Sequence, residues 1–207
     1  MSDSKAEIRD AASVILVRER GDGPELEVYL VRRHRKAGFM ASSFVFPGGI
    51  SDPRDGGDLR ATGARELFEE AGVLLASPVI DPATAAEWRP KVDKDGADLE
   101  AMLREKGSVL ARDLLHYYGH WITPSIEKRR YSARFYVARL PKSATASPCD
   151  RETVDEVWVT PDQALERKAE LRLPPPQVHT FMEIRDVARE GWDALARLCA
   201  VREQAKH

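Results

Sequence analysis

Branched aliphatic residues gather in short runs along the first fifty positions, and turn-forming residues separate these runs. Residues 11–18 and 26–32 are rich in Val, Ile, Leu and Tyr, which is typical of β-strands. Residues 21–24 between them read Gly-Asp-Gly-Pro and predict the turn of a hairpin. A third short strand is expected at residues 44–46, where Pro-Gly-Gly at 47–49 ends it.

The spacing of apolar residues changes to that of a helix between residues 59 and 71. When successive residues advance by about 100°, one face of this helix is apolar, formed by Ala64, Leu67, Phe68 and Ala71. Gly72 stands where a glycine commonly ends a helix. Residues 73–75, Val-Leu-Leu, are expected to enter the core as a strand.

After residue 80 the chain is expected to be helical before it returns to strands. We interpret residues 81–118 as a helical insertion, in which Asp-Pro opens one helix and residues 99–103 and 109–115 form two more. The later strands and helices are expected at residues 131–140, 154–160, from 161 onward, 178–188 and 192–204. Interleaved strands and helices favour one α/β domain over residues 1–207, with C-terminal helices at 175–207.

The charge balance argues against a nucleic-acid partner. The chain holds 34 acidic and 32 basic residues, a formal net charge of −2, whereas nucleic-acid-binding domains usually carry a basic excess. Its two cysteines, Cys149 and Cys199, have no metal-ligand spacing and are expected to be reduced thiols. No apolar run approaches the roughly 18 residues of a membrane span, and the polar N-terminus has no secretory signal. We therefore expect a cytoplasmic protein that binds no membrane.

Three glutamates share one face of the helix at residues 59–71. Glu69 lies about 60° to one side of Glu66 and Glu70 about 40° to the other, opposite the apolar face. Like charges at this spacing repel by roughly a few tenths of a kcal/mol per pair. A divalent cation would turn the repulsion into a binding site, because Mg²⁺ prefers oxygen ligands. Taken alone, however, the pattern favours a solvated acidic face.

The neighbouring residues favour the metal site. Residues 65–73 match the second half of the Nudix box, REUxEExGU, at every specified position, and residues 46–49 resemble the FPGG that opens it in many members. On these motifs the chain resembles the Nudix hydrolase family over residues 11–160. The resemblance implies a Nudix fold, a mixed β-sheet sandwiched between helices (α/β/α), here with a helical insertion after the Nudix helix.

The resemblance implies a magnesium site. Glu66, Glu69 and Glu70 are expected to ligate Mg²⁺, with Mn²⁺ as an alternative ion. The backbone carbonyl of Gly48 or Gly49 would add a further ligand, because a small residue lets the backbone approach metal and phosphate.

The resemblance also implies a reaction. Glu69 and Glu70 are assigned to the catalytic group together with Arg65, which would orient the glutamates by charge-assisted hydrogen bonds; a surface salt bridge is the alternative role for Arg65. The implied activity is hydrolysis of a phosphoanhydride bond in a nucleoside-diphosphate-linked substrate. The rival interpretations are a Nudix-fold ligand sensor without activity, against which the intact glutamates argue, and a partner-binding scaffold that uses the insertion.

The first half of the family box is not reproduced. A glutamate follows its glycine by six positions in the family, whereas no Glu lies between Gly49 and Arg65, which stand two positions further apart than in the family. Asp52, Asp55 or Asp58 can substitute. Because that glutamate is mainly structural in the family, the departure affects the loop more than the chemistry.

Many members use a further glutamate from a distant loop as a base or metal ligand. Glu152 and Glu156, shortly before Trp158, are the candidates in this chain. We favour Glu152 as the catalytic residue, since Glu156 in a strand register is equally an exposed strand residue.

A basic cluster precedes the box. Residues 32–36 read Arg-Arg-His-Arg-Lys, and we assign Arg33 and Arg35 to binding a substrate phosphate. A solvated hairpin end is the alternative. The insertion is placed by connectivity to cover the site or a dimer partner, so we expect it to set substrate choice and leave a homodimer open.

The substrate prediction comes from one branch of the family. Residues 121–124 and 129–131 are similar to the coenzyme A diphosphatase branch, peroxisomal and bacterial, and Arg130 is assigned to substrate binding on this resemblance. The chain departs from the branch at residues 130–133 and in the arginine spacing of its coenzyme A signature. Coenzyme A or an acyl-CoA is the leading substrate, with ADP-ribose, dinucleotides and nucleotide sugars as alternatives.

Overall fold

The aliphatic runs of the N-terminal half form the centre of a mixed sheet in a computed structural model, which describes residues 7–33, 42–127, 129–142, 144–149 and 153–206. Strands β1 (Ile8–Glu19) and β2 (Leu26–Arg33) make the predicted antiparallel hairpin. Strand β8 (Arg130–Arg139) lies parallel to β1 on its other side. The main path runs β3-β2-β1-β8-β7, and β4 pairs with β1 and β9 with β2. The bounds of these four are β3 Phe44–Val45, β4 Gly48–Ile50, β7 His116–Ile122 and β9 Thr153–Val159.

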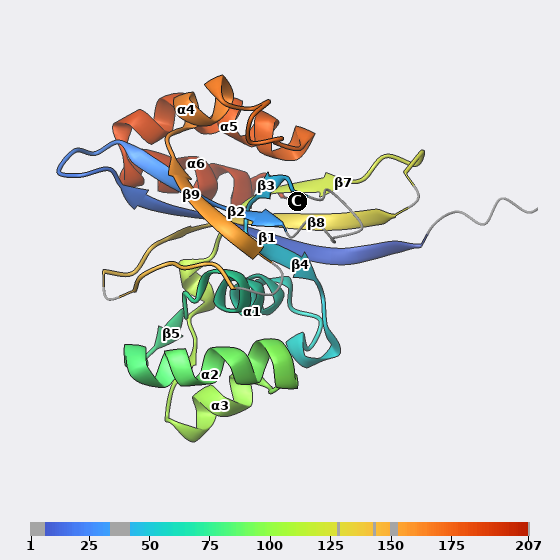
Figure 1. The fold of residues 1–207 in the computed structure, drawn as a ribbon, viewed down its shortest axis with the longest axis vertical. Helices are drawn as coiled ribbons and strands as arrows, with labels where there is room; N and C mark the ends of the chain where they lie inside the picture. Colours follow the sequence, from blue (N-terminus) through green and yellow to red (C-terminus); the bar gives the residue numbers. More distant parts are fainter. Residues whose placement is uncertain (1–6, 34–41, 128, 143, 150–152, 207) are drawn as a thin grey trace, which may run out of the picture.

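The period-2 alternation of β1 builds two cores, one on each face of the sheet. Ala12, Val14 and Leu16 belong to a buried cluster with the Nudix-box helix α1 (Leu59–Ala71). Ile15 and Val17 belong to a second cluster on the opposite face. That face is covered by α4 (Pro161–Glu166), α5 (Pro175–Glu190) and α6 (Trp192–Gln204) (Figure 1). The predicted mixed sheet between helical layers (α/β/α) is therefore confirmed.

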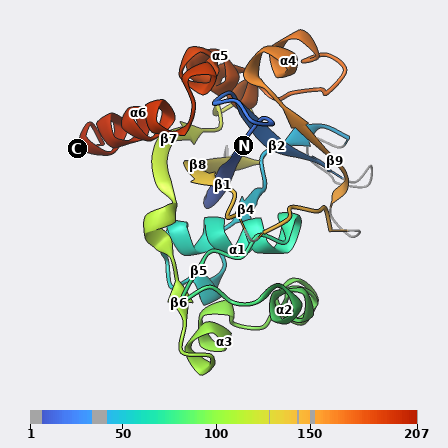
Figure 2. The same cartoon turned by 90° about the vertical axis from the view of Figure 1, so that its left-hand side faces the viewer.

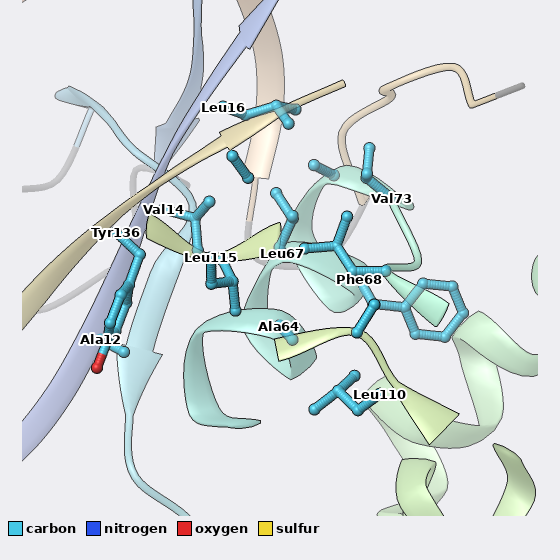
Figure 3. Close-up of a cluster of buried hydrophobic side chains, with 14 of the residues drawn as sticks. Ala12, Val14, Leu16, Ala64, Leu67, Phe68, Val73, Leu110, Leu115 and Tyr136 are labelled. Atoms are coloured by element: carbon cyan, nitrogen blue, oxygen red, sulfur yellow. The ribbon is translucent and has the colours of Figure 1, made fainter. Parts of the chain in front are cut away.

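Helix α1 has the predicted bounds. The Asp58 side chain caps its first turn by accepting from the amide of Arg60, and Gly72 ends it with a φ of 68°, in the left-handed region that glycine tolerates best. Its apolar face enters the core as predicted, with Leu67 and Phe68 fully buried (Figure 3). Residues 73–75 also enter the core, but as irregular backbone and not as the predicted strand.

The insertion forms an extra layer outside α1 (Figures 1 and 2). Helices α2 (Pro82–Asp95) and α3 (Leu99–Glu105) start at the predicted places, capped by aspartates that precede them. They share the core of α1, since Trp88 and Val92 of α2 are buried in the same cluster. The insertion and α1 therefore share one core, and a single domain over residues 1–207 stays a prediction. None of the helices in the described ranges combines the length and apolarity needed to cross a bilayer.

The end of the insertion differs from the prediction of a third helix at residues 109–115. The backbone of β6 (Val109–Leu110) instead pairs with β5 (Ala76–Ser77), and a short 3-10 turn, η2 (Arg112–Leu114), follows. Strand β7 then begins at His116, so the insertion ends before residue 118. Pairing with β5 determines the conformation of residues 109–110, and the spacing of apolar residues within the segment cannot reveal that pairing.

Candidate active site

The two box glycines lie on β4, pressed between β1 and α1. Gly48 and Gly49 pair with Ser13 and Ala12 of β1. A Cβ on Gly48 would lie 2.4 Å from the carbonyl oxygen of Ala12, and one on Gly49 would lie 2.4 Å from Oε1 of Glu66. Only glycine therefore lets this strand approach the carboxylates of α1.

Arg65 is the centre of the site. Its Nε and Nη2 donate to the two carboxylate oxygens of Asp55 at 2.8 and 3.1 Å, and Nη2 also donates to the carbonyl oxygen of Ile50. Its Nη1 donates to Glu66 at 2.8 Å and to Glu69 at 2.9 Å. All five N–H donors of the guanidinium are used. Arg65 thus holds Glu66 and Glu69, two of the three glutamates, and burial of its side chain excludes the alternative of a surface salt bridge.

Asp55 occupies the place of the missing box glutamate. It stands six positions after Gly49, and its side chain is 3% exposed where it pairs with Arg65. It also caps η1 (Pro53–Asp55) by accepting from the amide of Asp52, and the Thr62 hydroxyl donates to it at 2.8 Å. Among the three aspartates left open by the sequence, Asp55 is the one that joins the site.

The three glutamates do not form the solvated face that the helical wheel gives. Glu66 and Glu70 are buried, and the Glu69 side chain is only 13% exposed. The wheel assumes one buried face, but α1 lies between the sheet and the insertion, and ten of its 13 residues are buried. The prediction that the carboxylates lie away from the packed interior is therefore wrong.

Burial changes the acidity of these groups. Desolvation and the neighbouring charge of Glu66 raise the pKa of Glu69 to about 7. The same two causes raise the pKa of Glu70 well above its ordinary value, although a hydrogen bond from the Gly48 amide opposes the shift. For Arg65, burial alone would lower the pKa, but Asp55, Glu66 and Glu69 raise it. Negative charge exceeds positive charge in this buried group.

The donors present fit a hard divalent cation. Oε1 of Glu69 is buried and accepts no hydrogen bond within the described residues. All the side-chain donors are carboxylate oxygens, which Mg²⁺ prefers. They point in two directions, since Glu66 and Glu69 face Arg65 while Glu70 accepts from the Gly48 amide at 2.9 Å. Accordingly, no preassembled cluster of three metal-ligating side chains occurs in the described ranges.

Of the two candidates for the distal glutamate, only Glu156 lies in the described residues. Glu152 lies outside the described residues. Glu156 lies on β9, where it accepts a hydrogen bond of 2.5 Å from the hydroxyl of Tyr29. Burial, followed by this hydrogen bond and the charge of Glu156, raises the pKa of Tyr29, and Glu70 contributes to the same shift. Glu156 is therefore part of the polar surroundings of the box carboxylates.

The predicted substrate arginines are not brought together in the described residues. Arg33, at the end of β2, is close enough for its charge to act on Glu70. Arg35 lies outside the described residues. Arg130, at the start of β8, donates to the carbonyl oxygen of Thr123 and so holds the β7–β8 turn. The proximity of Arg33 to Glu70 fits the predicted role, whereas the contact of Arg130 with Thr123 is local.

Arg89 and Ser147 are neighbours of the site that the sequence reasoning missed. Nε of Arg89 on α2 donates to the carbonyl oxygen of Glu69 at 3.0 Å, and its two terminal nitrogens donate to Ser147. Neither residue belongs to a motif, so the chain carries no local signal for them.

A groove of about 560 Å³ lies at the other end of α1. It is bordered by the N-terminal turn of α1, η2, β7 and α6, and none of the box glutamates lines it. Its arginines already have acidic partners, Arg60 with Glu203 at 3.0 Å and Arg112 with Asp58 at 2.6 Å. The groove is therefore separate from the chemistry of the box.

Comparisons with known proteins agree with this geometry. The family model described as "NUDT19 Nudix domain" matches residues 54–184. The chain is 27% identical over 190 residues to "Putative nudix hydrolase 7" of Caenorhabditis elegans, covering 89% of this chain and 62% of that protein. It is 23% identical over 233 residues to "Acyl-coenzyme A diphosphatase NUDT19" of Xenopus laevis, covering 80% and 61%. The chain thus spans about three fifths of the length of these relatives.

A solved structure shows the same fold. The NUDIX hydrolase from Alicyclobacillus acidocaldarius superposes with a TM-score of 0.76 at 24% identity, covering 88% of this chain and 93% of that one.

Proposed function

Because the chain belongs to the Nudix hydrolase family, as its match to the NUDT19 Nudix domain shows, we propose that it hydrolyses a diphosphate bond in a Mg²⁺-dependent reaction, with coenzyme A or an acyl-CoA as substrate. A sensor without activity is the weaker alternative, because a ligand-binding fold has no need to bury repelling carboxylates.

One observation carries the proposal. Among the described residues, one buried cation, Arg65, lies between four buried or nearly buried carboxylates, those of Asp55, Glu66, Glu69 and Glu70. Burying uncompensated charge is costly. The raised pKa values of Glu69 and Glu70 report this cost, and a divalent cation would remove it.

In the proposed reaction, the glutamates, Arg65 and the glycine pair have different roles. Glu66, Glu69 and Glu70 would hold the ion, with a main-chain carbonyl of the glycine pair, and Arg65 fixes the first two carboxylates. The glycines keep side chains out of the space between β4 and α1. The ion, when bound, would neutralise diphosphate oxygens and lower the pKa of the attacking water. Glu152 stays our assignment for the distal catalytic residue, and Glu156 with Tyr29 is the described alternative.

The substrate is argued from Arg33 and from the relatives. A coenzyme A molecule carries a 3′-phosphate that a cation near the metal site would bind, and Arg33 is near enough for its charge to lower the pKa of Glu70. A similar protein from Xenopus laevis carries the name acyl-coenzyme A diphosphatase. The cytoplasmic location, the homodimer and the absence of a nucleic-acid partner stay predictions.

A turnover screen in ¹⁸O-water tests the proposal. Coenzyme A, acetyl-CoA, ADP-ribose, NADH and a nucleotide sugar are incubated with the protein and Mg²⁺. We expect cleavage of the CoA compounds, with the label on one phosphate product because water attacks phosphorus. Cleavage of phosphomonoesters only would sink the mechanism. Metal-dependent binding without turnover of any compound would favour the sensor.

The phosphate contact has its own test in the same assay. Arg33→Ala should raise KM for coenzyme A about tenfold more than for dephospho-coenzyme A, the size of one partly exposed charge-assisted contact. Arg20→Ala, at the opposite end of the β1–β2 hairpin, is the matched control and should leave both values unchanged. Equal effects of Arg33→Ala on both substrates would remove the phosphate role.

A further inference from the structure

Arg89 joins three segments that are far apart in the sequence. It sits on α2 of the insertion, held in place by the buried side chains of Trp88 and Val92 on either side of it. Its Nε donates to the main-chain carbonyl of Glu69, while Nη1 and Nη2 donate to the hydroxyl and the carbonyl of Ser147 at 3.1 and 2.9 Å. One planar guanidinium thus connects the insertion, the metal helix and the segment that leads toward β9.

These contacts provide hydrogen-bond donors to backbone carbonyl groups at the C-terminal end of α1. The last carbonyl groups of a helix have no partners within the helix. Here the Glu69 carbonyl accepts from Arg89, the Phe68 carbonyl from the Gly72 amide and the Ala71 carbonyl from the Ser147 amide at 2.9 Å. A cation at a helix C-terminus is also favoured by the helix dipole. The turn fixed in this way is the one that presents the side chains of Glu69 and Glu70.

Close packing leaves Arg89 little freedom. A Cβ on Gly72 would lie 2.9 Å from Nη1 of Arg89, so the glycine that ends α1 also makes room for the guanidinium. A second arginine ties the insertion down from the other side, because Nη1 of Arg54 on the box loop donates to the carbonyls of Val92 and Ala97. The insertion is thus fastened to the box through the middle of α2, at Arg89, and near its C-terminal end, at Val92 and Ala97.

We propose that Arg89 is a positioning residue for the reaction, through which the insertion fixes the last turn of α1 and sets where Glu69 and Glu70 hold the ion. This inference rests on the proposed function. It also gives the insertion a role different from covering the substrate: it acts on the main chain of Glu69 and on Ser147. Arg89 itself touches neither substrate nor ion in this scheme.

The test compares Arg89→Gln and Arg89→Lys with Lys91→Gln, an exposed lysine two positions along the same helix that loses the same charge. We measure kcat, KM, Mg²⁺ affinity by calorimetry, and hydrogen exchange of the Gly48 and Ser147 amides. Arg89→Gln should lower kcat and Mg²⁺ affinity between about tenfold and a hundredfold, with little change in KM, the usual cost of losing a contact that orients a metal ligand. Exchange should rise at Ser147, and at Gly48 because Glu70 accepts from its amide.

The Lys variant separates geometry from charge. It keeps the cation but cannot donate to Glu69 and Ser147 at once, so it should recover less than half of the lost Mg²⁺ affinity. Wild-type kcat and Mg²⁺ affinity in Arg89→Gln would overturn the inference. So would a loss that Lys91→Gln shares, or one that disappears when the assay is cooled, because global instability would then explain it. If the parent protein cleaves no diphosphate, the proposed function fails, while the Mg²⁺ affinity and the amide exchange still decide whether Arg89 positions the carboxylates.

Discussion

Two clusters of charged side chains, one on each side of the sheet, use the same residue types in opposite ways. On the face covered by α5 and α6, Glu183 accepts from the Tyr118 hydroxyl at 2.6 Å and pairs with Arg202 at 3.1 Å. On the face of α1, Glu66 and Glu69 pair with Arg65. The first cluster joins β7, α5 and α6, whereas the second lies within α1 and the turn that precedes it.

The acidity of the carboxylates separates the two. Burial would raise the pKa of Glu183, but the hydrogen bonds of Tyr118 and Arg202 hold it below its ordinary value. The pKa of Glu69 is raised to about 7 although Arg65 lies next to it. The two clusters differ in the balance between negative and positive side chains. A single Glu faces a single Arg in the first cluster, whereas several carboxylates share one Arg in the second. A satisfied network holds a fold together, while an unbalanced one indicates a ligand.

The largest effect expected from this contrast is on turnover. Replacing both Glu69 and Glu70 with Gln should lower kcat about 10²–10³-fold or more, because charges aimed at the reacting phosphate are lost. Glu183→Gln should leave kcat within about twofold. Steady-state kinetics with coenzyme A and calorimetry with Mg²⁺ measure both. A double variant that turns over substrate like the parent would falsify the assignment of these glutamates.

The second effect is on stability. Asp55→Asn removes the bidentate partner of Arg65 where both side chains are almost fully buried, so unfolding should become easier by about 3 kcal/mol. For a domain of this size the melting temperature falls by roughly 6–12 °C. Asp52→Asn, in the same turn, breaks a more exposed pair with Arg54 and should cost under about 1 kcal/mol. Equal costs in urea titrations of the two variants would contradict the central place of the Asp55–Arg65 pair.

Most of helix α1 and its site residues could be predicted, because the sequence features that specify them are close together in the chain. The apolar spacing and Gly72 give the bounds of α1, and the motif gives Arg65 and the glutamates. Counting from Gly49 also leads to Asp55. The burial of the glutamates could not be predicted, because it depends on the insertion packing against the far side of α1.

The features that the sequence did not predict depend on contacts between distant segments. Residues 109–115 have apolar spacing compatible with a helix, yet β6 (Val109–Leu110) forms because β5 lies beside it. Arg89 is one arginine among many in a polar helix, and nothing near it in the sequence distinguishes it. Its role follows only from where α2 meets the carbonyl of Glu69 and the Ser147 segment.

The smallest expected effect is the dependence of stability on pH. It sharpens the comparison because Glu69 and Glu183 change the free energy of unfolding over different ranges of pH. Glu69 binds its proton more tightly in the folded protein than in the unfolded chain. Its contribution to the stability of the metal-free protein is therefore lost as pH rises from its ordinary pKa through about 7. Glu183 behaves oppositely: its contribution is present above its ordinary pKa and is lost only at lower pH.

Saturating Mg²⁺ should therefore raise the melting temperature more at pH 8 than at pH 5.5, by a few degrees, since protons occupy Glu69 at the lower pH and ligand binding stabilises by mass action. Glu69→Gln should make both the Mg²⁺ shift and its pH dependence smaller, and the dependence that remains should come from Glu70, whose pKa is also raised. Glu183→Gln should leave the pH dependence of the shift unchanged, because that carboxylate is ionised across the whole range. Thermal melts of the three proteins with and without Mg²⁺ measure this. If the parent's shift is larger at pH 5.5, the protons and the ion do not compete for the carboxylates on α1, and the charge imbalance around Arg65 has another cause.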